Sequence, residues 1–200
     1  MTVQTDSHAA PDLAPAAERL ADLVLGVPDS LLSEPTPCAE YTLGDLVDHV
    51  GGFAVAFTAA ARKASADAVE APRPGDAAQL EDGWRTRIAR DLRGMAEAWR
   101  DPQAWTGMTQ VGGVELPGEA AGVIGLDELV VHGWDVARAS RQPYGCDTAS
   151  LEGVLSFVAL DSPMGQMARS NGIFGPAVEV PDGSPLLDRV IGLAGRQPAW

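Results

Sequence analysis

The chain is poor in cysteine, in histidine and in positive charge. It has 2 cysteines and 3 histidines in 200 residues, and 14 Lys and Arg face 28 Asp and Glu, which gives a net charge of −14. Cys38 and Cys146 are too few for a disulfide framework, and we expect both thiols to be free. The negative charge argues against nucleic acid and anionic membranes as partners, because both are bound through lysine and arginine.

Long apolar runs are also absent. No segment reaches the roughly 20 consecutive apolar residues of a membrane span. The first ten residues are polar and lack a basic stretch, so we expect no signal peptide and a cytoplasmic location. With 46% hydrophobic and 21% charged residues, the composition is that of a globular protein. We expect a flexible tail over residues 1–10 and one domain over residues 11–200.

What the sequence does contain is apolar residues at helical spacing. The predicted helices cover residues 13–27, 43–63, 77–99 and 117–140, with shorter ones at 148–160 and 185–194. Thr42, with Asp45 three residues later, is a favourable N-cap for the second helix. The predicted fold class is therefore all-α, a four-helix bundle with short additional helices.

Three segments interrupt this helical pattern. Residues 105–116 contain Gly112-Gly113 between short stretches that tolerate β structure, which predicts a small β-hairpin. Residues 67–78 contain proline and aspartate and are predicted to form a linker. Residues 176–180 are apolar and are a candidate for a short strand.

The fourth predicted helix carries the most informative pair of residues, Glu128 and His132. In a helix, positions i and i+4 lie on one face, so a carboxylate and an imidazole converge about one turn apart. The surrounding sequence is apolar on most faces of the helix, which predicts that both side chains point into protein. A buried carboxylate has to be neutralised, hydrogen-bonded or bound to a metal.

A second histidine completes a possible site. His49 lies at the edge of the apolar face of the second helix and can reach the bundle interior. Two imidazoles and one carboxylate form a metal site with an open coordination position, suited to zinc, nickel or iron(II). The alternative is that an E-x-x-x-H pair arises by chance and forms an ordinary helical ion pair.

Two long stretches of the sequence resemble a known family. They are Pro35-Thr-Pro-Cys-Ala-Glu-Tyr-Thr-Leu-Gly-Asp-Leu-Val-Asp-His49 and Glu128-Leu-Val-Val-His-Gly-Trp-Asp-Val-Ala-Arg-Ala139. They resemble the DinB-like superfamily, in the branch around mycothiol-dependent maleylpyruvate isomerase, and in particular its actinobacterial single-domain metal-binding proteins. The end of the chain, from Phe174 to Trp200, is similar too.

The resemblance implies a four-helix bundle that binds a divalent metal through His49, Glu128 and His132. It also implies mycothiol as a possible cofactor and a homodimer as a possible assembly. The isomerase carries a further C-terminal domain that helps to form its active site. This chain, which runs to Trp200, leaves no room for that domain, so maleylpyruvate is not an expected substrate.

Four further residues leave alternatives open. Asp135 either pairs with Arg138 on the helix surface, which we favour, or orients a metal ligand. Asp48 is expected to face solvent and Trp134 to anchor the core. Cys38 is either a small buried residue, which we favour, or a reactive thiol near a helix N-terminus.

Two classes of function fit these observations. The first is a metal-dependent thiol transferase or isomerase, in which the ion holds a small thiol as the thiolate that attacks a small electrophile. The second is a non-catalytic protein whose metal is structural or serves to sense or hold a ligand. A closed fourth coordination position, or the lack of an accessible pocket above the ion, would favour the second.

Overall fold

The computed structural model describes residues 10–65, 73–170 and 172–200. Four long helices dominate them: α1 (Ala14–Leu25), α2 (Leu43–Ala61), α3 (Trp84–Ala98) and α4 (Gly118–Ala139). Three shorter helices follow: α5 (Thr148–Val158), α6 (Pro163–Ser170) and α7 (Leu186–Leu193). The predicted all-α fold with a small hairpin is confirmed.

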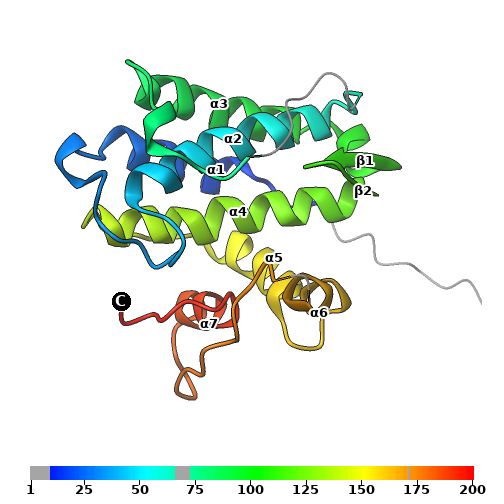
Figure 1. Ribbon diagram of the computed structural model, residues 1–200. Helices are drawn as coiled ribbons and strands as arrows, with labels where there is room; N and C mark the ends of the chain where they lie inside the picture. The colour runs from blue at the N-terminus through cyan, green and yellow to red at the C-terminus, as the bar shows by residue number, and fades with distance from the viewer. Residues whose placement is uncertain (1–9, 66–72, 171) are drawn as a thin grey trace, which may run out of the picture.

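Helix α4 is the central element of the fold. It packs against α1 and α2 on one side and against α5 on the other, while α7 packs on α5. Figure 1 shows α1–α3 lying along one side of α4 and α5–α7 along the opposite side. Because α4 is covered on both sides, its side chains are buried almost all round, as its apolar sequence predicts.

Small residues on α4 allow neighbouring elements to approach closely. A Cβ on Gly122 would lie 2.3 Å from the ring of Trp105, and one on Gly125 would lie 3.0 Å from Met95. Trp105 belongs to a short 3-10 turn, η4 (Pro102–Trp105), that precedes the hairpin. These contacts fix how α4 is rotated in the bundle, and therefore which of its polar side chains face inward.

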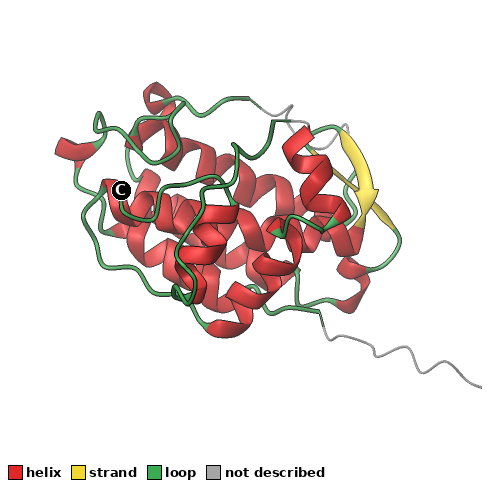
Figure 2. Cartoon of the chain, turned by 90° about the horizontal axis from the view of Figure 1, so that it is seen from below, coloured by secondary structure: helices red, strands yellow, loops and turns green. Residues whose placement is uncertain are grey.

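The predicted hairpin consists of β1 (Met108–Val111) and β2 (Val114–Pro117), which pair antiparallel from Met108↔Pro117 to Val111↔Val114. Gly112 and Gly113 form its turn with φ of 59° and 82°. Two consecutive positive φ angles are typical of the tight hairpin turn that favours glycine. The hairpin lies at one end of the helical body, where α4 begins (Figures 1 and 2).

The N-terminus of α2 is capped as the sequence predicts. Thr42 Oγ1 accepts a hydrogen bond from the Asp45 backbone N–H at 3.3 Å, and Asp45 Oδ2 accepts one from the Thr42 N–H at 3.1 Å. Reciprocal bonds of this kind satisfy two backbone donors that the first helical turn leaves free. This capping box sets the start of the helix that carries His49.

Several predicted boundaries are wrong. The third helix begins at Trp84 instead of residue 77, because a 3-10 turn, η3 (Ala77–Gln79), and Gly83 at φ 77° precede it. Residues 176–180 are not a strand; Val178 donates its N–H to the Gly192 carbonyl instead. Helix α6, which starts at Pro163 after α5 has ended, was not predicted from the sequence.

Two predicted segments lie partly outside the described residues: the tail over residues 1–10, of which residues 1–9 are not described, and the linker over residues 67–78, of which residues 67–72 are not described. Within the described ranges, no helix is both long and apolar enough to cross a bilayer.

Candidate metal centre

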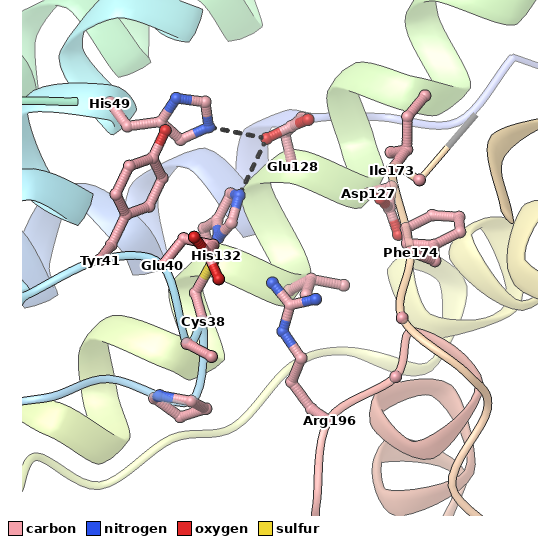
Figure 3. A pocket seen from close by; sticks show the side chains of 16 residues that line it. Cys38, Glu40, Tyr41, His49, Asp127, Glu128, His132, Ile173, Phe174 and Arg196 are labelled. Carbon is pink, nitrogen blue, oxygen red and sulfur yellow. Dashed lines mark ion pairs between the residues drawn. The ribbon is translucent and has the colours of Figure 1, made fainter. Parts of the chain in front are cut away.

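The three predicted ligands meet at one point between α2 and α4. The Nε2 atoms of His49 and His132 lie 3.5 Å and 3.2 Å from Oε2 of Glu128. The three candidate ligand atoms all lie within 4.8 Å of one another. Figure 3 shows both rings pointing at the same carboxylate oxygen. The helical i, i+4 spacing brings Glu128 and His132 together, and the packing of α2 on α4 adds His49.

Asp135 holds the ring of His132 from the other side. Its Oδ2 lies 3.0 Å from Nδ1 of His132 and 3.1 Å from Nη2 of Arg196, and its side chain is fully buried. The favoured pairing of Asp135 with Arg138 is therefore wrong. Arg138 donates instead to the Trp200 carbonyl. The contact with Asp135 orients the candidate ligand His132, because with Nδ1 facing a carboxylate, Nε2 of His132 is left to face Glu128.

Electrostatic attraction favours a proton or a metal ion between the Glu128 carboxylate and the imidazoles that face it. Oε2 of Glu128 is buried and faces Nε2 of His132 and Nε2 of His49, its two ion-pair partners. Burial alone would raise the pKa of Glu128, but the hydrogen bonds and charges of His132 and His49 outweigh it and hold that pKa well below its usual range. Burial likewise would lower the pKa of His132, but Asp135 and Glu128 raise it to about 10.

A neutral His132 that donates Nδ1–H to Asp135 would turn the lone pair of Nε2 toward the carboxylate oxygen of Glu128. Two acceptors facing each other repel, so either a proton or a metal ion has to lie between them. Without a metal ion, the raised pKa of His132 corresponds to the first case, in which a proton lies between the two atoms. The same three atoms are suitable ligands in the second case.

Aromatic rings and a loop segment surround His49. Its ring centroid lies 5.4 Å from that of Tyr41 and 5.7 Å from that of Phe53. The segment 73–79 crosses the N-terminal half of α2. A Cβ on Gly75 would lie 2.0 Å from the Asp45 carbonyl oxygen and 3.0 Å from Cβ of His49, so only glycine permits this approach.

The prediction that Asp48 faces solvent is wrong. Asp48 is buried, binds the guanidinium of Arg73 through both carboxylate oxygens, and accepts a hydrogen bond from the Asp76 backbone N–H. Helical periodicity shows which face of α2 is apolar, but it cannot show that the segment 73–79 covers Asp48. Asp48 fastens that segment across α2, beside His49.

The candidate ligands open onto a cavity of about 420 Å³. One wall consists of Cys38, Glu40 and Tyr41, which precede α2. The opposite wall consists of residues 172–175 and 195–196 from the C-terminal part of the chain. In Figure 3, Cys38 and Tyr41 lie on one side of Glu128 and His132, and Ile173 and Phe174 lie on the other. The volume lies within the range of pockets for small molecules.

Two residues of this pocket were not anticipated from the sequence. Asp127 is buried, and its Oδ1 has no hydrogen-bond partner; burial, followed by the charge of Glu128, raises its pKa to about 8. A second carboxylate inside the apolar run of α4 was a signal that could have drawn attention to it. Arg196 gave no such signal, because it reaches Asp135 across 61 residues of sequence.

Cys38 forms a second possible ligand group with His132 and Asp135. In that group Asp135 is already paired with the guanidinium of Arg196, whereas the charged partners of Glu128 are the two candidate imidazoles. Burial raises the pKa of the half-buried Cys38 thiol, which disfavours the thiolate that binds metals. The group of His49, Glu128 and His132 is therefore the better candidate.

Cys38, favoured as a small buried residue, is only half-buried and lines the pocket. Trp134 is buried, as expected of a core anchor. Cys38 and Cys146 are both free.

Comparison with known proteins identifies the family. The model of the mycothiol maleylpyruvate isomerase N-terminal domain matches residues 13–137. The chain belongs to this family. The match confirms the predicted DinB-like membership and includes His49, Glu128, His132 and Asp135, but it ends before α5 and Arg196.

Two uncharacterized proteins of Mycobacterium tuberculosis, MT0763 and Rv0738, are each 25% identical to this family member over 136 residues. The matched region covers 66% of this chain and 67% of each relative. No solved structure matches the chain.

Proposed function

We propose that the protein binds a divalent metal ion through His49, Glu128 and His132. The observation that carries this proposal is the convergence of two imidazole nitrogens on one buried carboxylate oxygen, at the edge of an open cavity. Two imidazoles and a carboxylate suit zinc, nickel and iron(II), and zinc is the ion we expect. Three protein ligands leave a position for a small molecule.

We further propose that the protein is a metal-dependent thiol S-transferase or isomerase. When bound, the ion would keep a small thiol in its nucleophilic thiolate form at neutral pH. The family name supports mycothiol as that thiol. The alternative is a non-catalytic protein with a structural or sensing metal, and the open cavity favours the enzyme over it.

The residues of the chain have separate parts in this proposal. Asp135 holds the ring of His132 so that Nε2 faces the ion. Tyr41 and Phe174, on opposite walls of the pocket, would enclose a thiol and a small electrophile and exclude water from them. We assign no residue of the described pocket as a general base.

Titration of the cobalt-substituted protein with mycothiol tests this function. We expect a sulfur-to-metal charge-transfer band and release of about one proton per thiol bound at neutral pH, since the free thiol has a pKa of about 8.5. The Cys38→Ser variant is the matched control, because it removes the only thiol in the pocket lining. A band that persists in this variant comes from the added thiol. A cobalt protein that shows no band and releases no proton would favour the non-catalytic alternative.

A further inference from the structure

Arg196 connects the C-terminal part of the chain to the candidate metal centre. Its Nη2 and Nε lie 3.1 Å and 3.4 Å from the two carboxylate oxygens of Asp135, and its Nη1 donates to the Ala194 carbonyl. Its side chain is largely buried, with 11% exposed, and it also lines the pocket. Arg196 is the guanidinium drawn beneath His132 in Figure 3.

The contact forms a chain of three charged groups that ends at a candidate ligand. Arg196 holds both oxygens of Asp135, and Asp135 Oδ2 faces Nδ1 of His132. A carboxylate held by a two-point guanidinium contact cannot rotate freely. The orientation of Asp135 then determines the orientation and the tautomer of the imidazole that binds the ion.

We propose that Arg196 is a positioning residue for the metal centre, acting through Asp135 on His132. This inference rests on the proposed metal binding. The family model matches residues 13–137. If Arg196 has this role, the metal centre is completed by a segment that lies beyond those residues. The same segment supplies the second wall of the pocket, so it both encloses the ligand and holds the centre in its binding geometry.

A purely structural role is the competing explanation. In that case the Arg196–Asp135 pair would only fasten the end of the chain to α4, and its loss would lower the stability of the fold without changing the metal affinity of the folded protein. The two explanations differ in whether Arg196 affects the metal affinity of the folded protein and whether that effect passes through Asp135.

A double-mutant cycle separates them. Zinc affinity is measured by competition with a chelator for the native protein, Arg196→Gln, Asp135→Asn and the double variant, at a temperature where circular dichroism shows each to be folded. Loss of a group that supports a metal ligand costs about 10–100-fold in affinity. We expect Arg196→Gln to weaken zinc binding by about tenfold, and to have less than about a twofold further effect in the Asp135→Asn background.

Two additional variants sharpen the result. Arg196→Lys keeps the charge but lacks the two-point contact, so we expect it to restore part of the lost affinity. Arg138→Gln is the matched control: Arg138 lies on α4 near Asp135 but binds the Trp200 carbonyl and does not line the pocket. It should leave zinc affinity unchanged.

The ring of His132 provides a spectroscopic readout. In long-range proton–nitrogen NMR spectra of the zinc-loaded native protein, we expect a single His132 tautomer with the proton on Nδ1, and loss of that uniformity in Arg196→Gln. An unchanged zinc affinity in Arg196→Gln, or equal effects of this change in both backgrounds, would overturn the inference while leaving metal binding intact. A native protein that binds no divalent ion would overturn the proposed function and this inference with it.

Discussion

Nδ1 of His132 lies 3.0 Å from Oδ2 of Asp135, so the ring presents its other nitrogen, Nε2, to Glu128. Asp135 is fully buried and is itself held by Arg196. This relationship gives His132 a fixed orientation before any ion binds, and a preorganised ligand loses less conformational freedom on binding. Several expected properties of the protein follow from it.

Removing any one candidate ligand should abolish tight metal binding. We expect His49→Ala, Glu128→Ala and His132→Ala each to weaken zinc affinity by on the order of 100-fold or more, because two ligands rarely retain a divalent ion. Metal analysis after dialysis measures the effect. Glu40→Ala is the control, since Glu40 lines the same pocket but is exposed. If a variant lacking all three residues still carried stoichiometric zinc, the metal site would lie elsewhere.

Metal binding should displace a proton from His132. The pKa of this residue in the metal-free protein is about 10, so it is charged at neutral pH and has to lose its proton before Nε2 can bind an ion. We expect the release of about one proton per zinc ion at pH 7.5, and an affinity that rises with pH between 7 and 9. Calorimetry in two buffers with different ionisation enthalpies measures the number of protons. Zinc binding without proton release would show that His132 is neutral beforehand.

The same pKa predicts how the stability of the metal-free protein depends on pH. The pKa of His132 is raised from 6.5 to about 10 on folding, so its stabilising contribution is complete below pH 6.5 and is lost as the pH rises through 10. The free energy of unfolding should therefore fall with pH in this window, by at most about 1.4 kcal/mol per pH unit. Urea denaturation of the metal-free protein measures the slope.

Asp127 also makes the free energy of unfolding fall as the pH rises, but at lower pH than His132. Its pKa is raised from 3.8 to about 8, so its contribution is lost as the pH rises through 8. Burial raises the pKa of Cys146 to about 11, so this thiol adds to the slope from pH 8.5 to 9.5. The contribution of His132 is therefore the difference between the native protein and His132→Gln, and we expect a smaller slope in the variant. An equal slope in this variant would assign the pH dependence to other groups.

The buried Asp48 should contribute more to stability than an exposed aspartate paired with arginine. Asp48→Asn weakens the contact with Arg73, so we expect a loss of about 1–3 kcal/mol in the free energy of unfolding. Asp29→Asn is the matched control: Asp29 also pairs with an arginine, Arg85, but is 75% exposed, and its loss should cost less than about 1 kcal/mol. Equal losses in the two variants would contradict the role assigned to Asp48.

Self-association remains a prediction. Large apolar side chains are exposed near α6, namely Leu160, Met167 and Ile173, and their burial in a homodimer would be favourable. We expect light scattering at high micromolar concentration to give the mass of a dimer, and Met167→Glu to shift it toward the monomer. The monomer mass for the native protein would contradict the prediction.

The sequence alone located the four long helices, the hairpin and the three candidate ligands, but not α6. Helical periodicity is a local property, so it located the four long helices and placed Glu128 and His132 on one face of α4. The Gly112-Gly113 turn and the Thr42 cap were predictable for the same reason, because each depends on residues within a few positions. His49 followed from its place beside the apolar face of α2 and from the family resemblance.

The tertiary structure decided what these elements contact. Asp48 was expected in solvent and Asp135 beside Arg138, since helical spacing alone cannot show that the segment 73–79 covers one residue and that Arg196 reaches the other. The pocket wall formed by residues 172–175 and 195–196 likewise joins parts of the chain that no local pattern connects. Side chains far apart in sequence meet only through the packing of whole elements, and that packing gives the candidate metal centre its second wall and its link to Arg196.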